Sequence, residues 1–236
     1  YVMEYYNNRI KVFDSSDAYL RSFGGYGNAC YQWQYARQFT IYNDVVYIAD
    51  TYGRKVKSLT LTGQCKDIWF TGQYPHAIAA NSNYVFVGNA SNSISVLDHR
   101  LNSRTTQSIN SNYLNYSWGM SINPAGNKLA IADYNKNHVV EFSISGDYLT
   151  YTQKTSSTYS SGNGYFQRPT DTGYDSSGNI YVTDLYGHRV QKFNSSLSYQ
   201  GKVGSYSTSS GFRYPYGMYV DSNDKVYATD FYNYAV

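Results

Sequence analysis

Short stretches in which apolar and polar residues alternate run through the whole chain, and clusters of Asn, Asp, Ser and Gly separate them. Residues 180–184 (IYVTD) and 189–193 (RVQKF) are the clearest examples. Such alternation predicts strands that are buried on one or both faces, and the polar clusters are typical of tight turns. No stretch shows a sustained helical period, so the sequence predicts an all-β fold.

A short motif recurs six times along the chain. In each copy a strand ends at an anchor position, and a short turn then leads to a basic residue and a further strand. We assign the anchors to Glu4, Asp50, Gly88, Asp133, Asp184 and Asp230, with glycine replacing the acid in the third copy. Successive anchors are 46, 38, 45, 51 and 46 residues apart. A period of roughly 40–50 residues favours a β-propeller over a sandwich or barrel.

The clearest repeat divides into four strands, at residues 169–174, 180–184, 189–193 and 198–203. The whole chain then forms one domain, residues 1–236, with six blades of four antiparallel strands. The terminal blades are incomplete, because the first repeat lacks its first strand and the last repeat lacks its fourth. Three explanations remain open: the sequence stops short of the domain, the ring closes with incomplete blades, or a second copy supplies the missing strands. Because the sequence begins inside a strand, we expect a processed or excised domain.

The residues of the best repeats resemble a known family. Phe166 and Pro169, the DSSGN turn at 175–179, the IYVTD strand and the RVQKF strand resemble the NHL repeat of β-propellers. The resemblance extends to residues 212–230 and 9–14. It implies a six-bladed propeller that binds proteins, RNA or other ligands; a minority of the family are enzymes, such as the peptidyl-hydroxyglycine lyase. The signatures of WD40 propellers are absent.

In this architecture, the loops that enter the first strands and the turns that follow the anchors lie on one face. Two sets of side chains should therefore surround one opening. We predict a ligand-binding face made of Gln38, His76, Trp118, Thr170 and Tyr216 from the loops, and Tyr6, Tyr52, Tyr134, Tyr186 and Tyr232 from the turns. Aromatic side chains in such a rim can stack on sugars or bases, or anchor a protein partner. The alternative is that the rings only fill gaps between neighbouring blades.

The repeated charged pairs, such as Asp184 with Arg189, are predicted to have a structural role. Their repetition argues against catalysis, because an active site is needed only once. Each acid is expected to accept backbone N–H groups of its own turn. A family-like lyase would need zinc-ligating histidines after Pro in several first strands, but only His76 fits. Thr170 and Tyr216 occupy the matching positions, and a zinc site needs three or four converging ligands. The sequence also holds no nucleophile elbow and no P-loop. We therefore predict no metal, no cofactor and no enzymatic activity.

The amino-acid composition argues against some classes of binding partner. Of the 236 residues, 15% are charged and the net charge is +3, which is too little for a dense basic patch, so nucleic acid is not favoured. Tyr is abundant, with 30 residues, and it suits half-buried strand faces. No apolar run is long enough to cross a bilayer, so no membrane insertion is expected.

Two weak signals favour secretion. Asn89, Asn115 and Asn194 head acceptor sequences for N-glycosylation. Cys30 and Cys65 are able to pair in an oxidising compartment, although their expected positions at opposite ends of a blade argue against a disulfide. We predict an extracellular interaction or assembly module that binds protein or glycan through its Tyr-rich face. The alternatives are a subunit that assembles into a fibre through its incomplete end blades, and an RNA-binding NHL domain.

Overall fold

The computed structural model describes residues 1–207 and 211–236, and every regular element in them is a strand. The all-β prediction is confirmed. In this part of the chain there is no helix long and apolar enough to cross a membrane. The chain divides into two compact units, which we call the first unit (residues 1–90 and 95–106) and the second unit (residues 91–94 and 107–236). The expected single domain over residues 1–236 stays a prediction.

Three antiparallel sheets build the first unit. They are β1 (Val2–Glu4), β2 (Arg9–Phe13) and β3 (Tyr19–Gly24); β4 (Gln38–Tyr42), β5 (Val45–Asp50), β6 (Lys55–Thr60) and β7 (Cys65–Phe70); and β8 (Pro75–Ala80), β9 (Val85–Asn89), β10 (Ser93–Leu97) and β11 (Ser103–Ser108). In the third of them, the first two residues of β10 and the last two of β11 are assigned to the second unit.

Three further sheets build the second unit. They are β12 (Ser117–Ile122), β13 (Lys128–Asp133), β14 (His138–Ser145) and β15 (Tyr148–Lys154); β16 (Pro169–Tyr174), β17 (Ile180–Asp184), β18 (Arg189–Phe193) and β19 (Tyr199–Val203); and β20 (Pro215–Val220) with β21 (Val226–Asp230).

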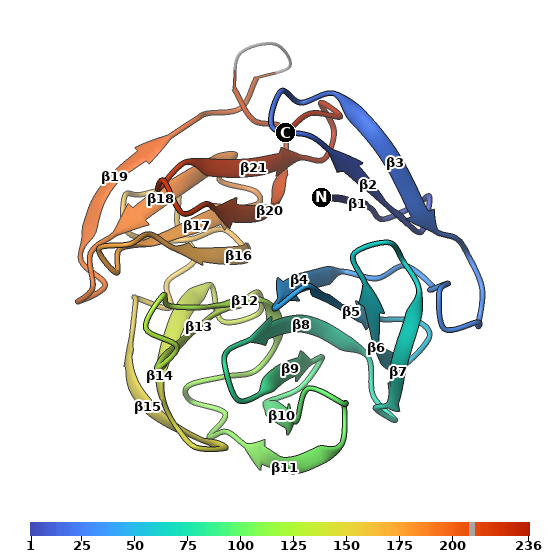
Figure 1. The fold of residues 1–236 in the computed structure, drawn as a ribbon. Coiled ribbons are helices and arrows are strands. Elements are labelled where there is room, and N and C mark those ends of the chain that lie inside the picture. The colour runs from blue at the N-terminus through green and yellow to red at the C-terminus, as the bar shows by residue number, and fades with distance from the viewer. Residues whose placement is uncertain (208–210) are drawn as a thin grey trace. The chain divides into compact units, whose positions relative to one another are not determined.

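Within each unit, the first strands of neighbouring sheets lie side by side. Figure 1 shows β4 beside β8 in the first unit, and β12 beside β16 and β16 beside β20 in the second. The second strands β5 and β9 are buried along nearly their whole length, whereas the outer strands β7 and β11 alternate between exposed and partly buried positions. Four-stranded antiparallel sheets arranged around their first strands are the blades of a β-propeller.

Buried apolar side chains fill the space between neighbouring sheets. In the second unit, Val182 and Phe193 pack with Phe166, which comes from the loop before β16. In the first unit, Tyr47 and Val56 pack with Ile78. Polar side chains hold the turns between strands. In the turn between β16 and β17, Asp175 Oδ1 accepts the N–H groups of Ser177 and Asn179, at 3.1 and 2.8 Å. The predicted turn chemistry of the repeats is therefore present.

The predicted number of blades is wrong. The described strands form four complete four-stranded sheets, a three-stranded sheet and a two-stranded sheet, which is enough for five blades and not for six. The sequence count rests on the anchors, and each anchor marks only a second strand. Counting anchors therefore counts each of the two incomplete sheets, β1–β3 and β20–β21, as a whole blade. The first sheet lacks a first strand, as predicted. The last sheet was expected to lack only its fourth strand, but it ends after its second, and only an isolated bridge between Asp230 and Ala235 follows.

Candidate functional site

The anchor acids join the loop that enters the first strand of a sheet to the end of its second strand. Four of them accept a backbone N–H from the loop that enters the first strand: Asp50 from Gln34 (2.7 Å), Asp133 from Asn115 (2.6 Å), Asp184 from Gln167 (2.6 Å) and Asp230 from Arg213 (2.9 Å). Burial raises the pKa of Asp133 and of Asp184 above the ordinary value. The turn wraps tightly around the carboxylate, because a Cβ on Gly187 would lie only 2.2 Å from Asp184 Oδ2. The anchors are structural turn residues.

The anchor of the third repeat is Asn89, not Gly88. Asn89 ends β9 and pairs with Pro75, as Asp184 pairs with Pro169 in the second unit. Gly88 is one position earlier and pairs with Ala77. The assignment to Gly88 is wrong because the following turn is one residue shorter than in the other repeats, which shifts the alignment. Asn89 is also buried, so it is a poor acceptor for a glycan.

The basic partners of Asp50 and Asp184 are buried with them. Arg189 Nε lies 2.8 Å from Asp184 Oδ2, and its terminal nitrogens donate to three backbone carbonyls of the preceding loop. The sequence spacing of five residues between Asp184 and Arg189 predicts Lys55 as the partner of Asp50, but the structure pairs Asp50 with Lys57, at 2.9 Å. Burial lowers the pKa of Lys57. These pairs hold loops against sheets. Among the described residues, no three His, Cys, Asp or Glu side chains are grouped as a metal site requires.

The register set by the anchors corrects one predicted site residue. Because Gln34 donates to Asp50, the residue that follows the Pro-like position in the first unit is Arg37 rather than Gln38. Gln38 lies one position further along, where its Oε1 accepts the N–H of Ile78 at 2.8 Å and joins β4 to β8. Asp171 has the equivalent position in the second unit and accepts the N–H of Met218 at 3.0 Å. Burial raises the pKa of Asp171 to about 7.

The other loop residues of the predicted set divide into buried and aromatic members. His76 and Thr170 are buried in β8 and β16, and the hydroxyl groups of Thr170 and Thr183 lie 3.0 Å apart. Burial, together with the nearby Arg37, lowers the pKa of His76 to about 3. Trp118 stacks on Tyr134, with ring centroids 4.2 Å apart. Tyr216 packs against Phe231 at 6.0 Å. These residues form an inner layer of the face in each unit.

Four tyrosines of the turns form an outer, exposed layer. Each lies two residues after its anchor, and their exposed fractions are 69% for Tyr6, 51% for Tyr52, 43% for Tyr186 and 46% for Tyr232. Tyr134 lies only one residue after Asp133 and belongs to the inner layer with Trp118. The tyrosines predicted from the turns therefore do not form one equivalent set.

A further tyrosine, which the sequence prediction missed, lies between each pair of outer rings. Tyr35 lies between Tyr6 and Tyr52, with ring centroids 6.5 and 5.8 Å away. Tyr214 lies between Tyr186 and Tyr232, at 5.6 and 5.1 Å. We call these the first triad (Tyr6, Tyr35, Tyr52) and the second triad (Tyr186, Tyr214, Tyr232).

Both central tyrosines have left-handed backbones, with φ of 51° at Tyr35 and 66° at Tyr214. This conformation is uncommon for a bulky residue and needs support from its surroundings. The amide of Tyr35 donates to Asn8 Oδ1 at 2.5 Å, and the amide of Tyr214 donates to His188 Nδ1 at 3.2 Å. Asn8 and His188 both lie four residues after their anchors, so the two triads are built in the same way.

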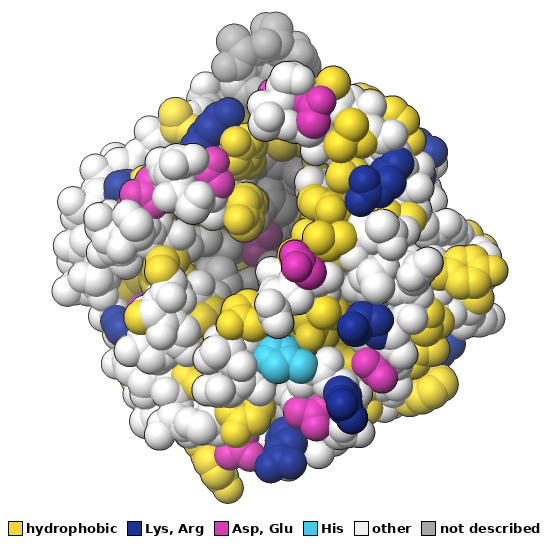
Figure 2. All heavy atoms as spheres, in the orientation of Figure 1, with side chains coloured by type: hydrophobic (Ala, Val, Ile, Leu, Met, Phe, Trp, Pro, Cys, Tyr) yellow, Lys and Arg dark blue, Asp and Glu magenta, His cyan; other side chains and the backbone are white. Residues whose placement is uncertain are grey.

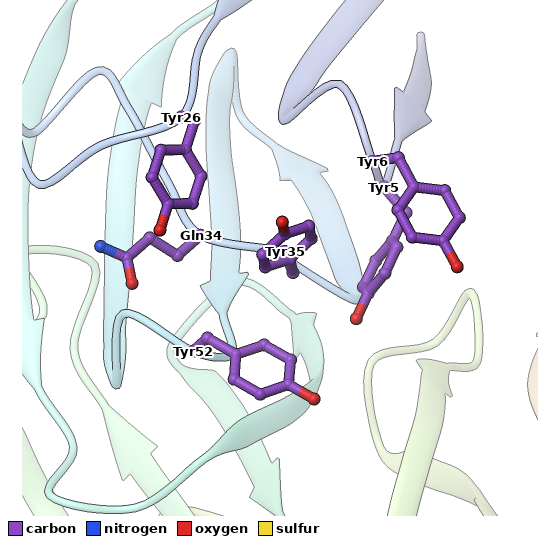
Figure 3. Close-up of a pocket in the computed structure, with 6 residues that line it drawn as sticks. All are labelled: Tyr5, Tyr6, Tyr26, Gln34, Tyr35 and Tyr52. Carbon is purple, nitrogen blue, oxygen red and sulfur yellow. The ribbon is translucent and has the colours of Figure 1, made fainter.

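Each triad borders an open depression. The first has a volume of about 460 Å³ and is lined by Tyr5, Tyr6, Tyr26, Gln34, Tyr35 and Tyr52. Figure 3 shows Tyr35 between Tyr26 and the pair Tyr5 and Tyr6, with Tyr52 beside it. The second has a volume of about 480 Å³ and is lined by Leu185, Tyr186, Arg213, Tyr214, Tyr216, Phe231 and Tyr232.

The two central tyrosines share a position that was visible in the sequence. Each directly precedes the Pro-like position that opens a first strand, where Pro215 follows Tyr214 and Ala36 follows Tyr35. Of the three remaining repeats, two have a tyrosine at the same position (Tyr74 and Tyr116) and one has Arg168. The prediction used the residue after the Pro-like position and overlooked the one before it.

The two cysteines form a disulfide, with Cα atoms 5.5 Å apart. The expectation that they lie too far apart was wrong, because the loop before β4 runs back over the sheet β4–β7. Lys57 in β6 donates to the carbonyl groups of Ala29 and Gln32 in that loop. Of the remaining glycosylation candidates, Asn194 lies in the turn between β18 and β19, and Asn115 Oδ1 accepts a hydrogen bond from Asn135 at 3.1 Å.

Comparison with known proteins supports the fold. Residues 166–193 match the NHL repeat family, and no curated protein sequence matches the chain. The chain is similar to virginiamycin B lyase from Staphylococcus aureus, with 14% identity and a TM-score of 0.65 over 92% of this chain and 69% of that one. It is also similar to a streptogramin B lyase (11%, TM-score 0.70, 97% and 71%) and to a protein of unknown function from Bacteroides thetaiotaomicron (13%, TM-score 0.73, 98% and 64%).

These identities show a shared fold and nothing about the reaction. They nevertheless correct the prediction that the chain is not an enzyme. Two of the similar structures are lyases, so a propeller of this kind does not exclude catalysis, and the prediction was wrong. The match of residues 166–193 to the NHL repeat and the propeller fold confirm the resemblance found in the sequence.

Proposed function

We propose that this protein is a binding module that holds its ligand, a protein or a glycan, against the two tyrosine triads. The observation that carries the proposal is the repeated construction of the triads. Each of two separate junctions between repeats brings three tyrosines together, and the backbone N–H of each central tyrosine donates to a side chain, of Asn8 or of His188. Tyrosine offers large contact area with a hydroxyl group at little cost in side-chain entropy, which suits a recognition surface.

The RNA-binding alternative receives less support. Single-stranded nucleic acid is normally held in a positively charged groove. The net charge is only +3, and the face drawn in Figure 2 shows acidic and basic side chains interspersed, without a continuous basic area. Assembly into a fibre through the terminal sheets stays a prediction.

We further propose that the protein works outside the cell. The Cys30–Cys65 disulfide supports this, because such bonds persist mainly in oxidising compartments. Asn115 and Asn194, both half-buried, are the remaining candidate glycan acceptors. The intact mass of protein from its natural source, before and after glycosidase and reductant, would test both points.

The binding function is tested with a ligand panel and two variants. The panel holds immobilised glycans, peptides and single-stranded RNA, and the affinity of each retained ligand is measured by calorimetry. Tyr52→Ser and Tyr186→Ser each remove one outer ring, and Tyr148→Ser removes a similarly exposed ring from the outer strand β15 as a control. Loss of one stacking ring is expected to weaken binding by roughly 5–150-fold at the affected triad. If every retained ligand binds all three variants like the wild type, the proposal fails.

A further inference from the structure

The lining of the first depression restricts the chemistry of its ligand. It consists of five phenol rings and the amide of Gln34, without a charged or aliphatic side chain. The amide is oriented by its own hydrogen bond, since Gln34 Nε2 donates to Asn28 Oδ1 at 3.0 Å. Such a lining offers aromatic faces together with neutral hydrogen-bonding groups. It suits a neutral ligand that has both flat apolar faces and many hydroxyl groups.

We propose that the two triads are equivalent subsites for saccharides, an inference that rests on the binding function proposed above. A pyranose ring presents C–H groups on its faces, which pack on phenol rings, and hydroxyl groups at its edge, which hydrogen-bond to phenols and amides. The central and outer rings of the first triad stand at 80° and 83° to each other, and Tyr186 stands at 88° to Tyr214. Tyr232 stands at 62° to Tyr214. Rings set at such steep angles present faces and edges to the same sugar.

The size and rigidity of the depressions agree with this ligand. Volumes of about 460 and 480 Å³ lie within the range of roughly 300–1,000 Å³ that is usual for small-molecule sites. The loop that carries Tyr26 and Tyr35 is fastened by the Cys30–Cys65 disulfide and by the buried side chain of Trp33. A preformed site loses less entropy on binding, which matters for a ligand as strongly hydrated as a sugar.

Other ligand classes fit the first depression less well. A nucleic acid would find only one cation nearby, because no Lys or Arg lines this depression and the guanidinium of Arg37 lies 5.7 Å from the centre of the Tyr5 ring. A peptide anchors best by inserting an apolar side chain into an apolar pocket, and the lining holds no aliphatic side chain. The second depression differs in having Leu185, Phe231 and Arg213, whose guanidinium lies 5.3 Å from the centre of the Tyr232 ring. The two subsites should therefore bind the same sugar with different affinities.

The left-handed backbone at the two central tyrosines allows a sharp test. Glycine adopts this conformation without strain, so Tyr35→Gly and Tyr214→Gly remove one ring each while keeping the loop. The probes are cellohexaose and chitohexaose, titrated by calorimetry into the whole chain, with a 20-residue oligouridylate as a further probe. We expect two sites per chain for at least one hexasaccharide, one site in either variant, and none in the double variant. Tyr148→Ser should bind like the wild type.

A second readout guards against unfolded variants. Bound hexasaccharide should slow the iodination of Tyr6 and Tyr52 in the wild type, measured by peptide mass spectrometry, and leave Tyr148 unaffected. The saccharide inference is overturned if neither hexasaccharide binds or protects these rings. If a peptide of the panel binds instead and is lost in the triad variants, the proposed binding function stands and only the saccharide inference is wrong. If oligouridylate alone binds and is lost in these variants, the saccharide inference and the proposed protein or glycan ligand are both wrong, and the RNA-binding alternative replaces them. If no ligand responds to any triad variant, both proposals fail.

Discussion

At the scale of single residues, Asn8 and His188 have the same role but differ in their acid–base chemistry, since Asn8 supports Tyr35 and His188 supports Tyr214. Each accepts the backbone N–H of a central tyrosine. An amide N–H only donates, so His188 Nδ1 must be unprotonated, and the neutral ring carries its proton on Nε2. Burial lowers the pKa of His188 below its ordinary value, and the charge of Asp230 opposes this effect. Asn8 does not titrate, so only the second triad is sensitive to pH.

We therefore predict that acidification weakens binding at the second triad alone. Below the pKa of His188, protonation of Nδ1 replaces an acceptor by a donor that faces the Tyr214 N–H, and the left-handed loop loses its support. Affinity at the second site should fall several-fold between pH 7.5 and 5, about as much as one hydrogen bond of roughly 1 kcal/mol is worth, while the first site stays unchanged. Calorimetric titration at both pH values checks this. His188→Asn should abolish the difference, and a first site that responds equally would contradict the explanation.

At the scale of elements, the loop between β3 and β4 decides the shape of the first depression. It supplies Tyr26, Gln34 and Tyr35, and it is held by three independent fastenings: the disulfide to Cys65, the two bonds from Lys57 and the anchor bond from Gln34 to Asp50. The equivalent loop before β16 has no disulfide and is held instead by Arg189. A buried cation that is paired with the anchor acid thus holds the loop in both units, and the disulfide is an addition in the first.

Removing the disulfide should loosen only this loop. For Cys30→Ser with Cys65→Ser, we expect the free energy of unfolding to fall by about 2–4 kcal/mol and the first site to bind more weakly, with the second site unchanged. Urea denaturation and the two-site titration measure the two effects, and reductant added to the wild type should reproduce them. Equal weakening of both sites would show that the loop does not act locally.

The sequence predicted elements better than side-chain partners. Period-two alternation and turn residues located the strands from 169 to 203 almost to the residue, because both signals are local. The errors at Gly88, Lys55 and Gln38 share another cause: each needed the register of two strands, and a single shorter turn or missing proline shifts that register by one or two residues. The exposed outer tyrosines were found, but Tyr35 and Tyr214 were not, since loop geometry brings them there.

At the scale of the whole molecule, buried ionisable groups give the two units different responses to acid. Burial lowers the pKa of His76 in the first unit to about 3, and that of His138 in the second to about 4. Both contributions to stability are complete above the unfolded value near 6.5 and are lost as pH falls. In the second unit Asp171, with its pKa raised to about 7, acts in the other direction. Its burial costs stability at neutral pH, and protonation relieves that cost as pH falls.

Between pH 7 and 5, the first unit should therefore lose more stability than the second. The His76 contribution to this loss is about 2 kcal/mol at pH 5. Hydrogen exchange followed peptide by peptide at both pH values would show faster exchange in β8 and β9 than in β16 and β17. Asp171→Asn removes the opposing effect, so the second unit should then weaken on acidification as well. Unchanged exchange in that variant would show that Asp171 does not titrate in this range.

Each triad takes one outer tyrosine from each of two consecutive repeats, and the central one from the loop between them. A single repeat thus has no recognition capacity of its own; the capacity belongs to the junction. If such a protein gains repeats by tandem duplication, a new repeat adds a binding site only when the new junction has tyrosine at both outer positions and at the central one. The third repeat, with Ser91 two residues after its anchor, marks where that condition is not met.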